Sequence, residues 1–60
     1  MKIRVRYESE VLGRGTHWEG TLDNVEGIRN IVAKFCVLRL LLDPSLKTVK
    51  DGMWIAEIVE

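Results

Sequence analysis

The stretch Phe35-Cys-Val-Leu-Arg-Leu-Leu-Leu42 decides the fold, because seven of its eight residues are apolar and its periodicity fits two structures. As a helix it continues the pattern before it, whereas as a strand over Val37–Leu42 it places alternate leucines on one face. No Gly, Pro, Asn or Asp lies between Asn30 and Asp43 to make the reversal that a helix-to-strand junction needs. The sequence therefore favours one continuous helix to Leu42, with the strand as the alternative.

The same helix is predicted to begin at Asp23, whose carboxylate can accept first-turn amide hydrogens while Glu26 returns a bond to the cap. The residues at helical spacing that predict its buried face are Val25, Ile28, Ile31, Val32, Phe35 and Cys36. Beyond Cys36 the pattern is no longer one-sided, because Arg39 falls within that face and Leu40 falls outside it. The last turns are therefore expected to be apolar on nearly every side.

Before the helix, residues 2–8 alternate between apolar and polar side chains, which is typical of a half-buried strand. Gly13-Arg14-Gly15 predicts a hairpin turn, since glycine tolerates positive φ. A second strand is expected over Thr16–Leu22, antiparallel to the first, with Trp18 on the buried face and His17 on the other.

After the helix, Asp43-Pro44-Ser45 predicts a stop. Leu46–Val49 is a candidate short strand, Lys50-Asp51-Gly52 a turn, and Met53–Val59 a last strand that is apolar on both faces. We therefore expect one α+β domain over residues 1–60, a small two-layer fold of order β-β-α-(β)-β.

Length and composition then bear on assembly. The chain has 60 residues, of which 47% are hydrophobic. A core this small gives only marginal stability without a disulfide, a structural metal or association with another chain. One cysteine and one histidine provide neither an intrachain disulfide nor a four-ligand zinc site, so association remains. We expect a homodimer whose interface is formed by the apolar residues that a single helix and sheet leave over: Val37, Leu40, Leu41, Ile55 and Val59.

Catalytic motifs are missing. His17 and Glu19 have no nucleophile at a recognisable spacing, Cys36 falls on the apolar stripe, and the glycines match no phosphate-binding loop. We expect no catalytic residues, no metal and no cofactor. The free cysteine and the lack of a signal peptide or membrane span predict a cytoplasmic protein with no membrane partner.

The net charge of the chain helps to decide which class of partner it binds. Nine basic and nine acidic residues cancel, which weakens the case for nucleic acid. The sequence predicts a non-enzymatic interaction or regulatory module that binds and modulates an unidentified protein, with contact residues Lys2, Arg4, Arg6, Arg14 and His17. The alternative is a small nucleic-acid-binding regulator that uses the basic face of the first strand.

Overall fold

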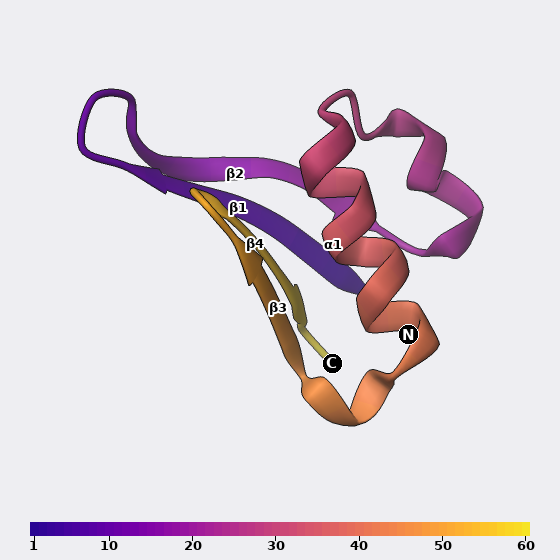
Figure 1. Ribbon diagram of the computed structural model, residues 1–60. Helices are drawn as coiled ribbons and strands as arrows, with labels where there is room; N and C mark the ends of the chain where they lie inside the picture. Colours follow the sequence, from indigo (N-terminus) through magenta and orange to yellow (C-terminus); the bar gives the residue numbers. More distant parts are fainter.

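One antiparallel sheet of four strands in the order β2-β1-β4-β3 forms the base of the fold, and a single α-helix lies across one of its faces (Figure 1). A computed structural model describes residues 1–60, with β1 (Ile3–Ser9), β2 (Gly13–Gly20), α1 (Ile31–Leu42), β3 (Thr48–Asp51) and β4 (Trp54–Ile58). Two short 3-10 segments, η1 (Leu22–Gly27) and η2 (Pro44–Leu46), flank the helix. The predicted small α+β fold is confirmed, including a strand before the last turn, but this strand covers Thr48–Asp51 instead of Leu46–Val49, so Lys50 and Asp51 belong to the strand and not to the turn.

The N-terminal hairpin reverses at residues 10–12, three residues earlier than predicted. The hydroxyl of Ser9 accepts hydrogen bonds from the N–H groups of Val11 (3.2 Å) and Leu12 (3.1 Å), and Gly13 then takes a φ of 82°. A hydrogen bond from the backbone to a side chain can stabilise a turn, and the pattern of hydrophobic residues does not reveal such a bond. The tip consequently exposes 91% of Val11 and 67% of Leu12.

β2 carries a bulge that breaks the predicted alternation of the second strand. Val5 of β1 pairs with Trp18, but the next residue of β1 pairs with Thr16, so His17 is an extra residue. The His17 ring lies 4.9 Å from the ring of Trp54, which shares the helix-facing side of the sheet with Val5. The prediction that His17 points away from that side is therefore wrong.

The helix begins seven residues later than predicted. The Asn30 side chain accepts hydrogen bonds from the N–H groups of Val32 (2.9 Å) and Ala33 (3.2 Å), which makes Asn30 the N-cap. The predicted capping box at Asp23 does not form, since this segment is a 3-10 turn with no side-chain cap. The favoured prediction, that Val37–Leu42 is helical, is confirmed, and the alternative strand is not observed.

The helix buries a different face from the one predicted. Its buried residues are Ala33, Cys36, Val37 and Leu40, while 60% of Ile31 and 56% of Phe35 remain exposed. The later helix start explains the difference in the buried face. Val25 lies outside α1, so the predicted stripe that begins at Val25 does not set which side of α1 faces the sheet. Small side chains at Ala33 and Cys36 let the helix approach the sheet closely.

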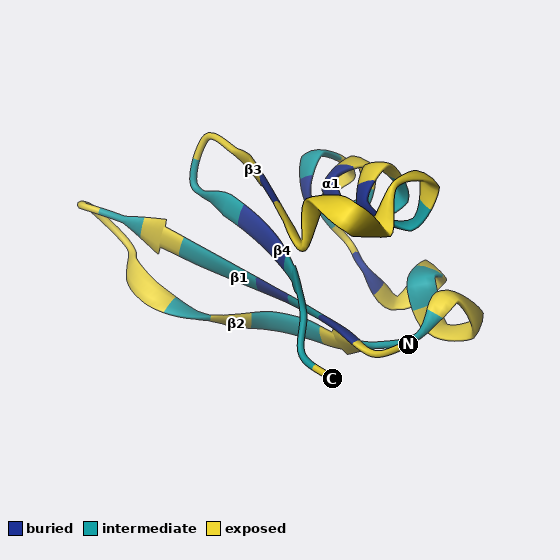
Figure 2. Ribbon diagram, turned by 90° about the horizontal axis from the view of Figure 1, so that it is seen from below, coloured by how far each residue is buried: buried dark blue, intermediate teal, exposed yellow.

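The core lies between the helix and the sheet, chiefly over β4, β3 and the first half of β1 (Figure 2). Its strand residues are Ile3, Val5, Val49 and Ala56, and Val49 pairs directly with Ala56. The end of the sheet that carries the β1–β2 turn extends beyond the helix (Figure 2). The fold thus leaves three regions open: the outside of α1, the hairpin end, and the sheet face opposite the helix.

Candidate functional site

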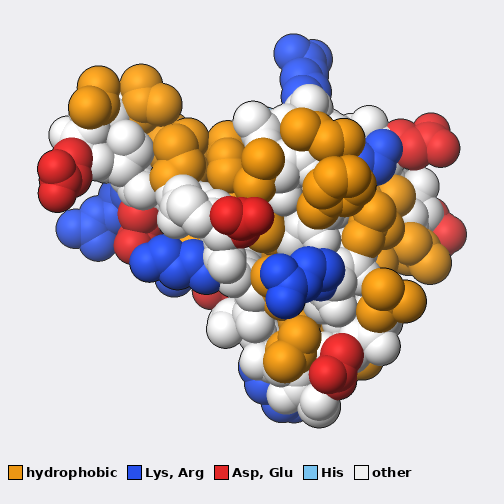
Figure 3. Space-filling model, viewed as in Figure 1, with side chains coloured by type: hydrophobic (Ala, Val, Ile, Leu, Met, Phe, Trp, Pro, Cys, Tyr) orange, Lys and Arg blue, Asp and Glu red, His pale blue; other side chains and the backbone are white.

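Four apolar residues form a stripe along the outside of α1, which we call the outer stripe: Ile31, Phe35, Leu38 and Leu42. Their spacing of four, three and four residues places them on one side of a helix, opposite the buried face. Exposure reaches 60% at Ile31, 56% at Phe35 and 87% at Leu42, while Leu38 is half-buried. In the space-filling view, several clusters of hydrophobic side chains lie over the region of α1, with charged side chains between them (Figure 3). An apolar row of this kind is typical of an interaction site.

The sheet face opposite the helix, which we call the open face, carries charges that pair with one another. The Glu19 carboxylate contacts Arg4 Nε at 2.7 Å and Lys2 Nζ at 3.0 Å. Glu57 contacts Arg6 Nε at 3.3 Å and also lies 3.9 Å from Arg4 Nη1. The basic row predicted on the first strand is present, but carboxylates of β2 and β4 neutralise it.

These ion pairs also shift the pKa values of two side chains on the open face. Hydrogen bonds from Arg4, and then from Lys2, hold the pKa of Glu19 below its ordinary value of 4.5. Hydrogen bonds to Glu8, and then to Glu57, raise the pKa of Arg6. Both shifts favour the charged forms, so the open face remains an array of paired charges at neutral pH.

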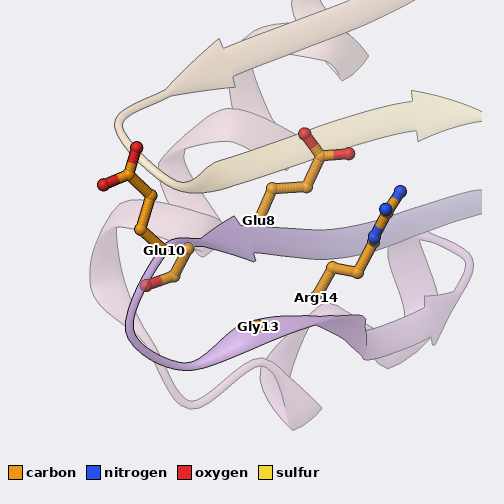
Figure 4. A pocket seen from close by; sticks show the side chains of 5 residues that line it. Glu8, Glu10, Gly13 and Arg14 are labelled. Atoms are coloured by element: carbon orange, nitrogen blue, oxygen red, sulfur yellow. The ribbon is translucent and has the colours of Figure 1, made fainter.

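Arg14 stands apart from this array, because no carboxylate lies within ion-pair distance of it. It lines a shallow hollow at the hairpin end together with Glu8, Ser9, Glu10 and Gly13 (Figure 4). Glu8 already pairs with Arg6, so the hollow offers one free carboxylate and one free guanidinium. With no hydrophobic residue in its lining, the hollow lacks the apolar walls typical of small-molecule sites.

The bulge places His17 in an aromatic cluster with Trp54 and Tyr7. The Trp54 ring lies 4.9 Å from that of His17 and 6.0 Å from that of Tyr7, both edge-on. The Nε2 atom of His17 is enclosed and has no hydrogen-bond partner. His17 therefore lies on the opposite side of the sheet from Lys2, Arg4 and Arg6, so the predicted contact residues do not form one surface.

The predicted interface residues are likewise dispersed. Val37 and Leu40 have no exposed surface, because they pack against the sheet of their own chain, so they are unavailable to a second molecule. Ile55 is 6% exposed and belongs to the open face, where Arg6 and Lys50 are its neighbours in the two ladders. Leu41 and Val59 are half-buried.

The outer stripe is the surface that sequence reasoning missed. Its 4-3-4 spacing is present in the sequence, but a helix that starts at Asp23 places Ile31 and Phe35 on the buried face. Asn30 was the signal that could have corrected this, since asparagine is a strong N-cap residue.

Cys36 lies between α1 and the sheet, where burial, with Asp51 nearby, raises the pKa of its thiol. A buried thiol of raised pKa is a weak nucleophile. No group of three or more His, Cys, Asp or Glu side chains is arranged to hold a metal ion. The helix is also too short to span a membrane.

The chain matches no protein-family model, no curated protein and no solved structure. The case for a function therefore depends on the surfaces described above.

Proposed function

We propose that the protein is a non-enzymatic interaction module that forms a homodimer through the outer stripe and binds another protein through its hairpin end. The observation that carries this proposal is the two-sided helix. One apolar side of α1 is buried by the sheet, while Ile31, Phe35 and Leu42 on the other side are more than half exposed. Covering such a row with another protein surface removes apolar area from water, which is the main driving force of association.

The hairpin end supports the second part of the proposal. Val11 is the most exposed aliphatic residue of the chain and Leu12 ranks third, after Leu42, and Ser9 holds their backbone in place. A tip that is ordered before binding loses little conformational entropy on contact. Arg14 and Glu10 beside it supply charges that can select a partner.

The first test is the mass of the protein in solution. Sedimentation equilibrium over a range of concentrations should show a dimer of the 6.9 kDa chain, and Phe35→Asp should shift it to monomer with an unchanged circular dichroism spectrum. Asn24→Asp adds the same charge at an exposed position away from the stripe and should leave the dimer intact. A monomer at every concentration for the unmodified chain would refute the dimer.

The second test addresses the hairpin end. A Val11→Ser, Leu12→Ser variant should remain folded and dimeric, because both side chains are exposed. Capture from native cell extract with this variant should lose a specific protein that the unmodified chain retains. Identical captured proteins would contradict binding through the tip.

A further inference from the structure

We infer that the outer stripe binds the outer stripe of a second copy with the two helices antiparallel, and that Lys34 and Arg39 exclude the parallel orientation. This inference rests on the proposed homodimer. Beyond the homodimer itself, we infer which residues meet across the two-fold axis and which charges select the antiparallel orientation of the two helices.

The spacing of the outer stripe is that of a coiled-coil seam. Ile31, Phe35, Leu38 and Leu42 recur at intervals of four, three and four residues, which is the d-a-d-a pattern of a heptad. Such a seam packs well against a second helix with the same pattern. A surface that complements itself is what a two-fold dimer requires.

An antiparallel two-fold axis at the middle of the stripe gives matched contacts. Ile31 then lies opposite the partner's Leu42, and Phe35 lies opposite the partner's Leu38. Each large side chain of one copy meets an aliphatic one of the other, and the two phenylalanines do not compete for the same space. The helix dipoles also oppose each other in this orientation, which is favourable.

The flanking charges discriminate against the parallel orientation. Lys34 precedes an a position and Arg39 follows a d position, so they are g and e residues five positions apart. In a parallel pair the g residue faces the e residue of the next heptad on the other helix, so Lys34 would face the partner's Arg39, twice. Like charges in such positions repel.

The antiparallel orientation removes this repulsion, because residues on equivalent flanks then meet. Lys34 lies beside the partner's Leu41, and Arg39 lies beside the partner's Val32. The methylene stems of both cations can cover these apolar neighbours while their charged ends remain in water. The pairing thus brings no two cations together.

The area is consistent with a second copy as the occupant. At about 200 Å² for a large side chain, the exposed fractions of Ile31, Phe35 and Leu42 amount to roughly 400 Å². This is about a tenth of the 4139 Å² surface of the chain, the proportion that specific interfaces usually cover. The lower end of specific interfaces is roughly 600 Å² for each partner, so Leu38 and the flanking residues must supply the remaining roughly 200 Å².

Disulfide trapping tests the orientation directly. Ile31→Cys and Leu42→Cys should form a disulfide under mild oxidation when mixed with each other, because these positions meet across the antiparallel interface. Each variant alone should not, since equivalent positions then lie about 16 Å apart along the helix, beyond the roughly 7 Å that a disulfide spans. The unmodified chain is the control for Cys36, which is 2% exposed.

The outcomes separate this inference from the proposed dimer. Cross-linking of each variant with itself indicates the parallel arrangement and overturns the inference, as does a dimer that the mixture does not trap. A chain that is monomeric by sedimentation refutes the dimer itself.

Charge reversal gives an independent check. Arg39→Glu should change the dissociation constant by less than about threefold, because the new carboxylate lies beside the partner's Val32. A parallel dimer would instead tighten about tenfold, since Lys34 would gain an opposite charge in both copies. Tightening of that size would by itself overturn the inference.

Discussion

The open face of the sheet and the outer stripe of α1 differ in whether their side chains have partners within the chain. The open face of the sheet carries charges, but Glu19 and Glu57 pair with the three cations of the N-terminal segment and β1. The outer stripe of α1 carries no charge and has no partner within the chain. A surface that satisfies its own groups gains little from a second molecule, whereas an exposed apolar row gains from being covered. This difference is why the proposed binding site lies on the helix.

The largest effect should come from comparing leucines on the two sides of α1. Leu40 is fully buried and Leu42 is 87% exposed. Leu40→Ala should lower the free energy of unfolding by about 2–5 kcal/mol through lost burial and a cavity. Leu42→Ala should change it by less than about 0.5 kcal/mol. Urea denaturation at low protein concentration, where the chain is monomeric, measures both.

The same experiment can overturn the assignment of the two sides. If Leu42→Ala destabilises the monomer as much as Leu40→Ala, then the helix is rotated from the orientation described here. If neither changes stability, then α1 does not pack on the sheet.

The fold class and most elements could be predicted from the sequence, but the exposed apolar stripe of α1 could not. Alternation predicted β1, the apolar run Met53–Val59 predicted the last strand, and the glycine-containing turn predicted the antiparallel pairing of β1 with β2. Asp43-Pro44 favoured a helix end at Leu42, with a strand over Val37–Leu42 as the alternative. These features are local, so a single sequence is enough to predict them.

The errors came from interactions that periodicity does not encode. Ser9 fixes the hairpin turn, and the bulge at His17 changes the face of one side chain, both through backbone geometry. Asn30 and Asp23 are equally good caps by residue type. The choice between them depends on which helix start lets Ala33 and Cys36 approach the sheet, which is a tertiary effect.

A smaller effect should follow from removing the cap that fixes the helix start. Asn30→Ala removes the acceptor for the N–H groups of Val32 and Ala33, and should cost about 1 kcal/mol of unfolding free energy. Asn24→Ala is the matched control, because the Asn24 side chain caps no helix and accepts one long hydrogen bond, from Thr21 Oγ1 at 3.4 Å. Equal losses in thermal or urea denaturation would show that Asn30 does not begin the helix.

Removing the carboxylates of the open face tests the nucleic-acid alternative. A Glu19→Gln, Glu57→Gln variant frees Lys2, Arg4 and Arg6 and should bind random oligonucleotides at low ionic strength, with the binding lost as salt is added. The unmodified chain should bind less under the same conditions, because these cations are already paired. Strong binding by the unmodified chain would instead favour the nucleic-acid alternative over the protein-binding module.

The smallest effect should be the acid sensitivity of the open face. Because Arg4 and Lys2 lower the pKa of Glu19 in the folded chain, its contribution to stability is present above the ordinary value of 4.5 and is lost as pH falls through the folded pKa. The urea midpoint should therefore fall slightly less on acidification in Glu19→Gln than in the unmodified chain. Glu26→Gln removes a carboxylate that makes no ion pair, so it should follow the unmodified chain. Identical pH profiles for all three would show that the ion pairs of Glu19 are too well hydrated to stabilise the sheet, which would leave the core beneath α1 as the main source of stability.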